Sequence, residues 1–148
     1  MADTPARNPE YPTFDECLKM GVHIAPMIGR MEADCGHSVL VAFLLRWGGV
    51  ELNIPKSAPD EKSPFATVLN WLRRDIGYGA WRVPRALVND RTVLRWRMLH
   101  LLRAGQSLSE VARAVGCTAR TVSYRKTDFT RRGLLPSPDL VPTKENRQ

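Results

Sequence analysis

The stretch that decides the fold is VGCTARTVSYRK, at residues 115–126. Gly116 stands two residues before Thr118, a spacing that fits a tight turn feeding a new helix. Glycine readily adopts a left-handed backbone, and threonine is a good N-cap. Basic side chains follow along the helix. A short capped helix of this kind is typical of the second helix of a helix-turn-helix, which enters a groove of DNA.

The residues before the turn predict the first helix of the pair. Ser107 and Glu110 have the spacing of a capping box, so this helix is expected to begin at Leu108. Counted from Leu108, Ala112 falls where the two helices cross and only a small side chain fits. Ordinary helical hairpins use the same spacing of Ala, Gly and Val, so the pattern by itself leaves both interpretations open. The shared core is expected from Val111, Val115, Cys117 and Val122.

The second helix is predicted to carry the residues that read bases. Arg120 is best suited to a bidentate contact with guanine, while Ser123 and Tyr124 reach base edges or phosphate. The full set of base-reading candidates is Ala119, Arg120, Ser123, Tyr124 and Thr127. The candidates for phosphate contact are Arg113, Thr118, Arg125, Lys126, Arg131 and Arg132.

One position of the second helix departs from the usual pattern. Arg125 stands where a third buried apolar residue is expected, with Tyr124 before it and Phe129 a turn later. Either Tyr124 turns inward and leaves base reading to Arg120 and Ser123, or Phe129 closes the core. The sequence does not choose between them.

The distribution of charge indicates a nucleic-acid partner. The chain has a formal charge of +7, yet residues 1–94 hold 11 basic and 11 acidic side chains. The excess lies in residues 95–132, the basic block, with nine basic and two acidic side chains. A block of one sign attracts a polyanion, and double-stranded DNA is the obvious partner. The basic members are Arg95, Arg97, Arg103, Arg113, Arg120, Arg125, Lys126, Arg131 and Arg132.

Length and composition limit the class of protein. A chain of 148 residues suits one domain or two small ones. It has no apolar run long enough for a membrane span and no secretory pattern at its start, so we expect a cytoplasmic protein with no membrane partner. Three scattered cysteines favour reduced thiols over a disulfide framework. We expect no cofactor.

Upstream of the basic block the sequence predicts helices. Residues 14–31 are helical in character but interrupted by Gly21 and Pro26, which predicts a kink or two short helices. Residues 37–47 are apolar nearly all round, which is typical of a buried helix, with Ser38 as the N-cap.

Two further helices have clear end signals. Ser63 as the cap and Pro64 at the first helical position predict a helix start. Asn89 or Asp90 is expected to cap the next helix, which Gly105 ends in a left-handed conformation.

Two stretches between the helices look alike. Residues 48–58 (GGVELNIPKSA) and 77–87 (GYGAWRVPRAL) both run from glycine through alternating residues to an apolar residue, proline and a basic residue. Alternation predicts half-buried strands that end at the prolines, because proline cannot donate to a ladder. A two-stranded or intersubunit sheet is expected, packed on the helices or paired across a dimer. The inward faces are expected from Val50, Leu52 and Ile54 and from Gly79, Trp81 and Val83.

This order of parts resembles the Mor transcription activator family of Mu-like phages, which includes the Mu C proteins. The resemblance is carried by GYGAWRVPRAL through SLSEVARAVGCTARTVSYRK and covers roughly residues 35–132. The upstream HSVLVAFLLRWGGVELNIPKS looks like a second copy of the family's helix and strand. That duplication and Arg125 depart from the family pattern. The matching positions are Gly77, Gly79, Pro84 and Arg85 for a strand end near DNA, and Ala119, Arg120, Ser123 and Tyr124 for the recognition helix.

The resemblance implies a homodimeric activator that binds a dyad-symmetric promoter site and recruits RNA polymerase through its alpha and sigma subunits. Its place would be the cytoplasm of a bacterial host, associated with the nucleoid. The alternative functions are a DNA-binding repressor and an accessory subunit of a recombinase or transposase.

The expected fold is mainly α with a small β element, in which an N-terminal helix and strand region precedes a C-terminal helix-turn-helix. Both ends of the chain are rich in proline. The predicted segments are a disordered tail at 1–13, a dimerisation region with the duplicated helix-strand unit at 14–88, the DNA-binding domain at 89–132 and a flexible tail at 133–148.

Other kinds of chemistry find little support in the sequence. A nuclease or recombinase needs a nucleophilic serine among arginines or a group of metal-binding carboxylates, and the acidic residues before position 95 show no such grouping, so we expect no enzymatic activity. An RNA-binding or scaffolding protein would favour aromatic platforms for single strands. The candidate zinc ligands match no usual spacing: Cys17, His23, Cys35 and His37. Most of the tryptophans are expected at the dimer seam: Trp47, Trp71, Trp81 and Trp96.

Overall fold

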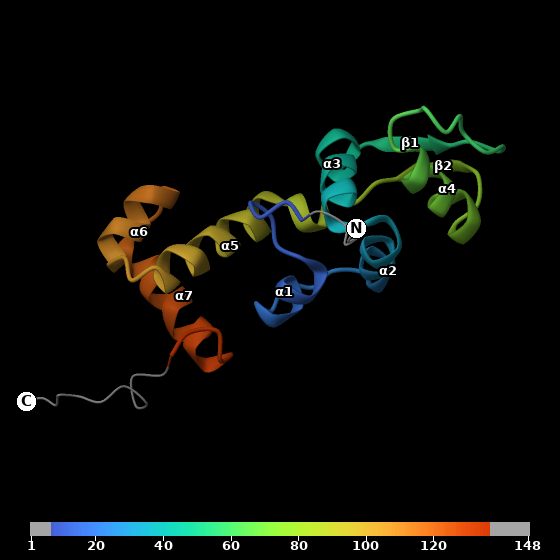
Figure 1. Ribbon diagram of the computed structural model, residues 1–148. Coiled ribbons are helices and arrows are strands. Elements are labelled where there is room, and N and C mark those ends of the chain that lie inside the picture. Colours follow the sequence, from blue (N-terminus) through green and yellow to red (C-terminus); the bar gives the residue numbers. More distant parts are fainter. Residues whose placement is uncertain (1–6, 137–148) are drawn as a thin grey trace, which may run out of the picture. The chain divides into compact units, whose positions relative to one another are not determined.

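The computed structural model describes residues 7–136 and contains two compact units. The N-unit comprises the chain up to Leu18 and Val22–Val93, and the C-unit comprises Lys19–Gly21 and the chain from Leu94 onward. Helix α5 (Asp90–Arg103) begins in the N-unit and continues into the C-unit. The described chain is mainly helical with one two-stranded antiparallel sheet, as the sequence predicts (Figure 1).

The N-unit begins with the two short helices expected from residues 14–31. Helix α1 (Phe14–Lys19) ends before Gly21, whose φ of 82° is left-handed, and α2 (Pro26–Cys35) starts with proline at its first position. Proline suits this position because the N–H that it lacks would have no helical partner.

Helix α3 (His37–Trp47) forms the centre of the N-unit core, but only one side of it is buried, where the sequence predicted a buried helix. Its side chains at Leu40, Phe43 and Leu44 are at most 1% exposed, whereas Val39 is 39% and Leu45 54% exposed. One side of the helix is therefore left uncovered by the other described residues, 7–136. The expected cap is also wrong, because Gly36 with φ 97° occupies the N-cap position and Ser38 lies inside the helix.

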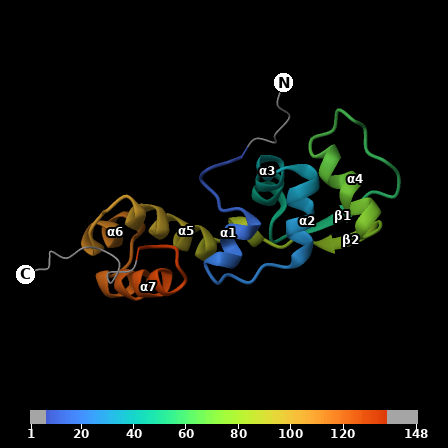
Figure 2. The ribbon, with the colours of Figure 1, turned by 60° about the horizontal axis from the view of Figure 1, so that its bottom comes forward.

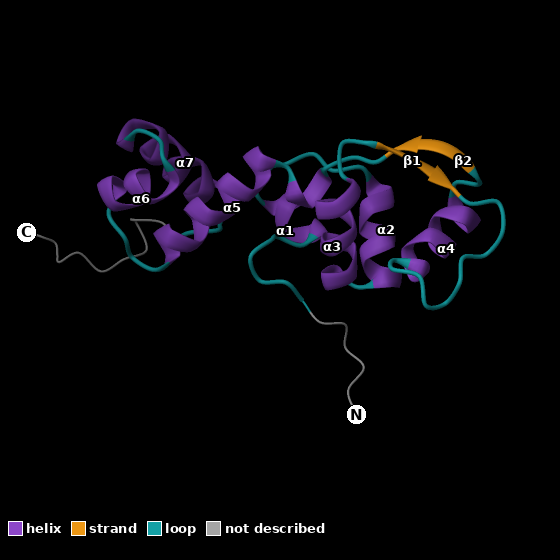
Figure 3. Cartoon of the chain, turned by 90° about the horizontal axis from the view of Figure 1, so that it is seen from above, coloured by secondary structure: helices purple, strands orange, loops and turns teal. Residues whose placement is uncertain are grey.

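The predicted strands pair with each other within one chain. Strands β1 (Glu51–Ile54) and β2 (Gly79–Arg82) are antiparallel, with Leu52 opposite Trp81 and Ile54 opposite Gly79 (Figure 3). Leu52 and Ile54 are buried, as expected for an inward face. Val50 is 46% exposed, so its predicted place on that face is wrong, because it precedes the regular strand.

Helix α4 (Ala66–Asp75) starts later than the sequence predicts, so Ser63 does not cap it. Phe65 holds the N-cap position in the left-handed conformation, with φ 64°. Its ring packs edge-on against Phe43, with 5.6 Å between ring centroids. This aromatic contact in the core offers a physical reason for the delayed start, because a residue other than glycine adopts this backbone only where packing compensates for the strain.

The tryptophans contribute to the cores of the units themselves. Trp71 is 1% exposed, and its indole N–H donates to Asp34 Oδ2 over 2.7 Å. Trp96 of α5 is 3% exposed. Trp47 and Trp81 are partly buried against the N-unit core. The expected place of most tryptophans at a dimer seam is therefore wrong for Trp71 and Trp96, which are already covered by their own chain.

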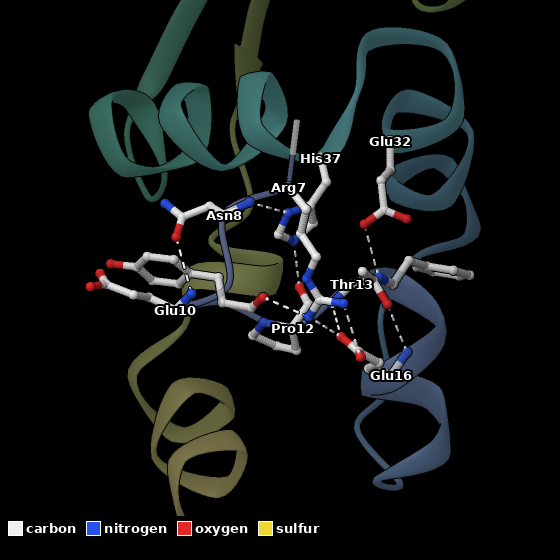
Figure 4. Close-up of polar contacts among 10 residues, drawn as sticks. Arg7, Asn8, Glu10, Pro12, Thr13, Glu16, Glu32 and His37 are labelled. Atoms are coloured by element: carbon white, nitrogen blue, oxygen red, sulfur yellow. Dashed lines mark hydrogen bonds and ion pairs between the residues drawn. The ribbon is translucent and has the colours of Figure 1, made fainter. Parts of the chain in front are cut away.

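The segment before α1 is bound to the helices, in contrast to the disordered tail expected for residues 1–13 (Figure 4). The Asn8 N–H donates to Nδ1 of buried His37, and the other ring nitrogen of His37 pairs with the Pro12 carbonyl at 3.0 Å. Thr13 and Glu16 cap α1 reciprocally, through bonds of 2.8 and 3.1 Å. Residues 1–6 of the expected tail lie outside the described residues.

The helices of the C-unit are the later part of α5, α6 (Leu108–Val115) and α7 (Ala119–Arg131) (Figure 2). Asn89 caps α5 by accepting the Arg91 N–H at 3.0 Å, and Gly105 follows the helix with φ 86°. Both signals were predicted. After α7 the chain turns at Gly133 and buries Leu135, so the start of the expected flexible tail is packed. Residues 137–148 lie outside the described residues.

Candidate DNA-binding interface

The capping box and the turn of the predicted helix-turn-helix are both confirmed. Ser107 Oγ accepts the Glu110 N–H at 3.1 Å, and Glu110 Oε1 accepts the Ser107 N–H at 2.8 Å. The pKa of Glu110 lies below its ordinary value because the Ser107 N–H, and after it the Ser107 side chain, stabilise the carboxylate by hydrogen bonding. Gly116 follows α6 with φ 78°, and the space around it is open. The glycine is therefore required by the backbone conformation and not by a close neighbour.

We expect Ser107→Ala to lower the free energy of unfolding by about 1 kcal/mol, because the Glu110 N–H at the start of α6 loses its side-chain acceptor. Urea unfolding followed by circular dichroism measures the change. Ser109→Ala is the matched control, since Ser109 lies exposed in the same first turn. Equal effects of the two substitutions would contradict the role of the capping box.

Helix α7 is anchored at its start by a cap. Thr118 Oγ1 accepts the Thr121 N–H at 3.1 Å and lies 3.0 Å from the Thr121 hydroxyl. Thr118 was predicted from sequence to contact phosphate, and the structure shows its hydroxyl engaged in the cap while the residue stays exposed. The cap fixes the direction in which the first residues of α7 leave the turn.

The structure shows which side chain, Tyr124 or Phe129, closes the core beneath α7. Phe129 and Val122 are fully buried, whereas Tyr124 is 69% exposed. Phe129 therefore closes the core and Tyr124 stays available on the surface. Arg125 is half-buried at the edge. Val111 and Ala112 are buried as predicted, but Val115 and Cys117 are only partly buried.

A row of exposed side chains runs along the outer side of α7. Arg120, Tyr124, Thr127 and Arg131 follow at spacings of four, three and four residues, so they share one side of the helix. All four are exposed, as are the neighbouring Ala119 and Ser123. We call Arg120, Tyr124, Thr127 and Arg131 the groove stripe. It contains four of the residues that the sequence analysis assigned to DNA, and the Thr127 hydroxyl donates to the Ser123 carbonyl at 3.1 Å.

Four of the six expected phosphate contacts fall into two groups. Arg113 and Lys126 are exposed and unpaired in the described part of the chain. Arg131 and Arg132 instead hold Asp128, through bonds of 2.5 Å to Oδ1 and 3.0 Å to Oδ2. Burial raises the pKa of Asp128, but the two arginines outweigh it and leave the pKa below its ordinary value. Asp128 is therefore ionised and fixes the direction of both guanidinium groups.

The strand-end residues that matched the family resemblance lie in the N-unit. Gly77 and Gly79 have φ values of 110° and 115°, which only glycine adopts freely. The side chain of Arg85 covers the Gly48–Gly49 turn, since a Cβ at Gly49 would lie 2.8 Å from Arg85 Nε. Pro84 follows β2 and is partly buried. Contact of these four residues with DNA stays a prediction.

Sequence reasoning missed two features of the C-unit. Arg95 was counted in the basic block without a role, yet its Nη1 donates to the Met20 carbonyl, 3.1 Å away and 75 residues earlier. No local signal predicts such a contact. Asp128 was not assigned either, although an acid three and four residues before two arginines has the spacing of a helical ion pair.

The candidate zinc ligands find no common site. Within residues 7–136 no three His, Cys, Asp or Glu side chains are placed to hold a metal ion. Burial, followed by the charges of Glu16 and Glu32, raises the pKa of Cys17 to about 12. Burial likewise raises the pKa of Cys35 to about 11. Burial therefore disfavours the thiolate form of both cysteines, which is the form that zinc binds.

A comparison with protein families finds a match for the C-terminal part of the chain. Residues 89–137 match the family of homeodomain-like domains, a helix-turn-helix class, and these residues include α5, α6 and α7. The match and the geometry together support a domain that binds double-stranded DNA. No curated protein and no solved structure matches the chain. Among the described helices, none is long and apolar enough to cross a lipid bilayer.

Proposed function

We propose that this protein is a homodimeric transcription activator that binds a dyad-symmetric promoter site of a Mu-like phage or prophage. In this proposal it acts in the bacterial cytoplasm, at the nucleoid, by recruiting RNA polymerase through its alpha and sigma subunits. It does so by binding alone, without catalysis of its own.

The single observation that carries the proposal is the groove stripe on a rigidly supported helix. Arg120 projects from the first turn of α7, directly after the Thr118 cap, where recognition helices read base edges. Val122 and Phe129 hold the opposite side of α7 in the core. A capped helix with an apolar inner side and a cationic outer side fits the major groove and its phosphates.

The proposed homodimer is supported by apolar side chains of α3 that are exposed to solvent. Val39, Ala42 and Leu45 are exposed and spaced three residues apart, and we call them the α3 face. Ala42 lies midway, so two antiparallel α3 helices that cross there bring Val39 of one copy against Leu45 of the other. Such a contact is isologous, as a two-fold dimer requires. The small side chain of Ala42 lets the helices approach closely.

A dimer is also what DNA recognition needs. One helix-turn-helix contacts few phosphates and base edges, whereas two modules about 34 Å apart read successive turns of one duplex. The order of helix, Gly-rich strand and helix-turn-helix resembles the Mor family, and this resemblance supports an activating role with polymerase as partner.

Selection of bound fragments from random double-stranded DNA, followed by footprinting, tests the proposal. We expect a palindromic site whose halves are about 10 base pairs apart. A transcription assay on a linear template carrying that site, with RNA polymerase holoenzyme, then separates the roles. Increased transcript supports an activator, whereas a decrease favours the alternative of a repressor. DNA strand transfer in the presence of a recombinase would favour the accessory subunit.

Arg120→Ala is expected to cost about 1–3 kcal/mol of binding free energy on the selected site and to relax discrimination at one base position. Lys126→Ala removes the same charge beside the groove stripe and should weaken all sequences equally. Repeating the selection with each variant measures both effects. A uniform loss in both variants would show that Arg120 does not read a base.

A further inference from the structure

The flank of α7 beside the groove stripe gathers arginines from two helices. Arg125, Asp128 and Arg132 follow one another at spacings of three and four residues, so they lie on one side of α7. Arg95 of α5 and Arg132 both lie against the Met20–Gly21 peptide. The pKa of Arg95 is lowered by burial and by the positive charges of Arg125 and Arg132, while Asp128 opposes them. We call Arg95, Arg125 and Arg132 the arginine cluster.

The peptide of Met20 and Gly21 holds two members of the cluster. Arg95 Nη1 donates to the Met20 carbonyl at 3.1 Å, and Met20 itself is fully buried. The guanidinium of Arg132 lies against Gly21, where an added Cβ would be 2.5 Å from Arg132 Cζ. Both guanidinium groups are therefore held before any ligand arrives, which reduces the entropy lost on binding.

The cluster has an excess of positive charge that the described chain does not neutralise. Among the described residues, Asp128 is the carboxylate that acts on Arg95, and its two oxygens already accept from Arg131 and Arg132. Within residues 7–136, Arg95 and Arg125 form no ion pair. Like charges that are half-buried repel one another more strongly than charges in free water. A bound anion would relieve this repulsion.

We propose that Arg95, Arg125 and Arg132 together bind one phosphate group of the DNA backbone, at the edge of the groove that the groove stripe enters. Guanidinium groups suit this ligand because their planar N–H donors match phosphate oxygens in pairs. Asp128 is a positioning residue that aims Arg132. The proposal rests on the proposed DNA-binding function and adds Arg95, from outside the helix-turn-helix pair, to the DNA contacts.

The salt dependence of DNA binding tests the cluster in the full-length protein. Each phosphate contact contributes about 0.9 to the slope of log K against log salt. Arg95→Gln should therefore reduce the slope by up to about 0.9 per bound subunit and weaken all DNA sequences alike. Arg97→Gln is the matched control, since it removes the same charge from an exposed position of the same helix. An equal change in both variants would overturn the proposal.

Two further measurements show whether a variant acts through misfolding, and whether the bound phosphate belongs to DNA or is a free anion. Arg125→Gln breaks no hydrogen bond of the described chain, so it should reduce the slope without lowering the thermal midpoint. Inorganic phosphate, compared with chloride at equal ionic strength, should raise the thermal midpoint of the natural protein but not of Arg95→Gln. Stabilisation by phosphate with unchanged salt slopes would overturn the DNA assignment in favour of a free anion.

Failure of the proposed function gives a different result. A natural protein that binds no DNA even at low salt would refute DNA binding, and the phosphate measurement would then still report on the cluster. No stabilisation by phosphate together with unchanged slopes would refute the cluster while leaving DNA binding intact.

Discussion

Replacing Phe129 with alanine is expected to lower the free energy of unfolding by about 3–5 kcal/mol, the usual cost of removing a buried aromatic ring. Phe129 is fully buried, and its carbonyl accepts the Leu134 N–H at 2.9 Å, where the chain turns back after α7. The loss would leave a cavity beneath the last turn of α7. Urea unfolding followed by tryptophan fluorescence measures it, because Trp96 is buried in the same unit.

Tyr124→Ala is the matched control for Phe129. Tyr124 lies five residues earlier on the same helix but is 69% exposed, so its removal should change stability by less than about 0.5 kcal/mol. It should instead weaken DNA binding, since Tyr124 belongs to the groove stripe. Equal losses of stability in the two variants would mean that Tyr124 also supports the core, contrary to the structure.

Leu45→Glu is expected to convert the proposed dimer into a folded monomer and to weaken binding to the proposed palindromic site by about 10²-fold or more. In the proposed contact each substituted side chain would place a carboxylate against apolar Val39 of the other copy, without a partner, which is costly. Loss of the second module removes an avidity gain of about 10²–10⁴. Sedimentation gives the oligomeric state, and titration of the labelled site gives the affinity.

The control adds the same charge elsewhere on the N-unit. Thr67→Glu lies on the exposed side of α4, in its first turn, and should leave both dimer and affinity unchanged. Leu45 is 54% exposed in the single chain, so the fold should tolerate glutamate there. A Leu45→Glu protein that remains a dimer would remove the α3 face from the interface without affecting the proposed role of the groove stripe.

The helix-turn-helix was predictable from sequence because its signals are local. The capping box joins Ser107 and Glu110, and the cap of α7 joins Thr118 and Thr121, all within one helical turn. The start of α4 was missed although Ser63 and Pro64 form a good local signal. There, Phe65 packs against Phe43, 22 residues away in sequence, and the helix begins later.

In the candidate site, too, local spacing was predictable from sequence, whereas contacts between distant residues were not. Sequence spacing placed Arg120, Tyr124 and Thr127 on one side of α7, because the helical repeat alone fixes that grouping. It left the choice between Tyr124 and Phe129 open, since either side chain is large enough to close the core. It also gave no indication that Arg95 meets Met20, because that contact depends on how α5 packs against a turn far upstream.

The amino-acid sequence alone determined the capped pair of helices, the turn at Gly116, the paired strand motifs and the location of the positive charge. The tertiary structure decided that the strands pair within one chain, that Phe129 closes the core, and that the rest of residues 7–136 leaves one side of α3 uncovered. Caps, turns and charge depend on residues a few positions apart. Burial depends on which distant segments meet, and only the folded chain brings them together.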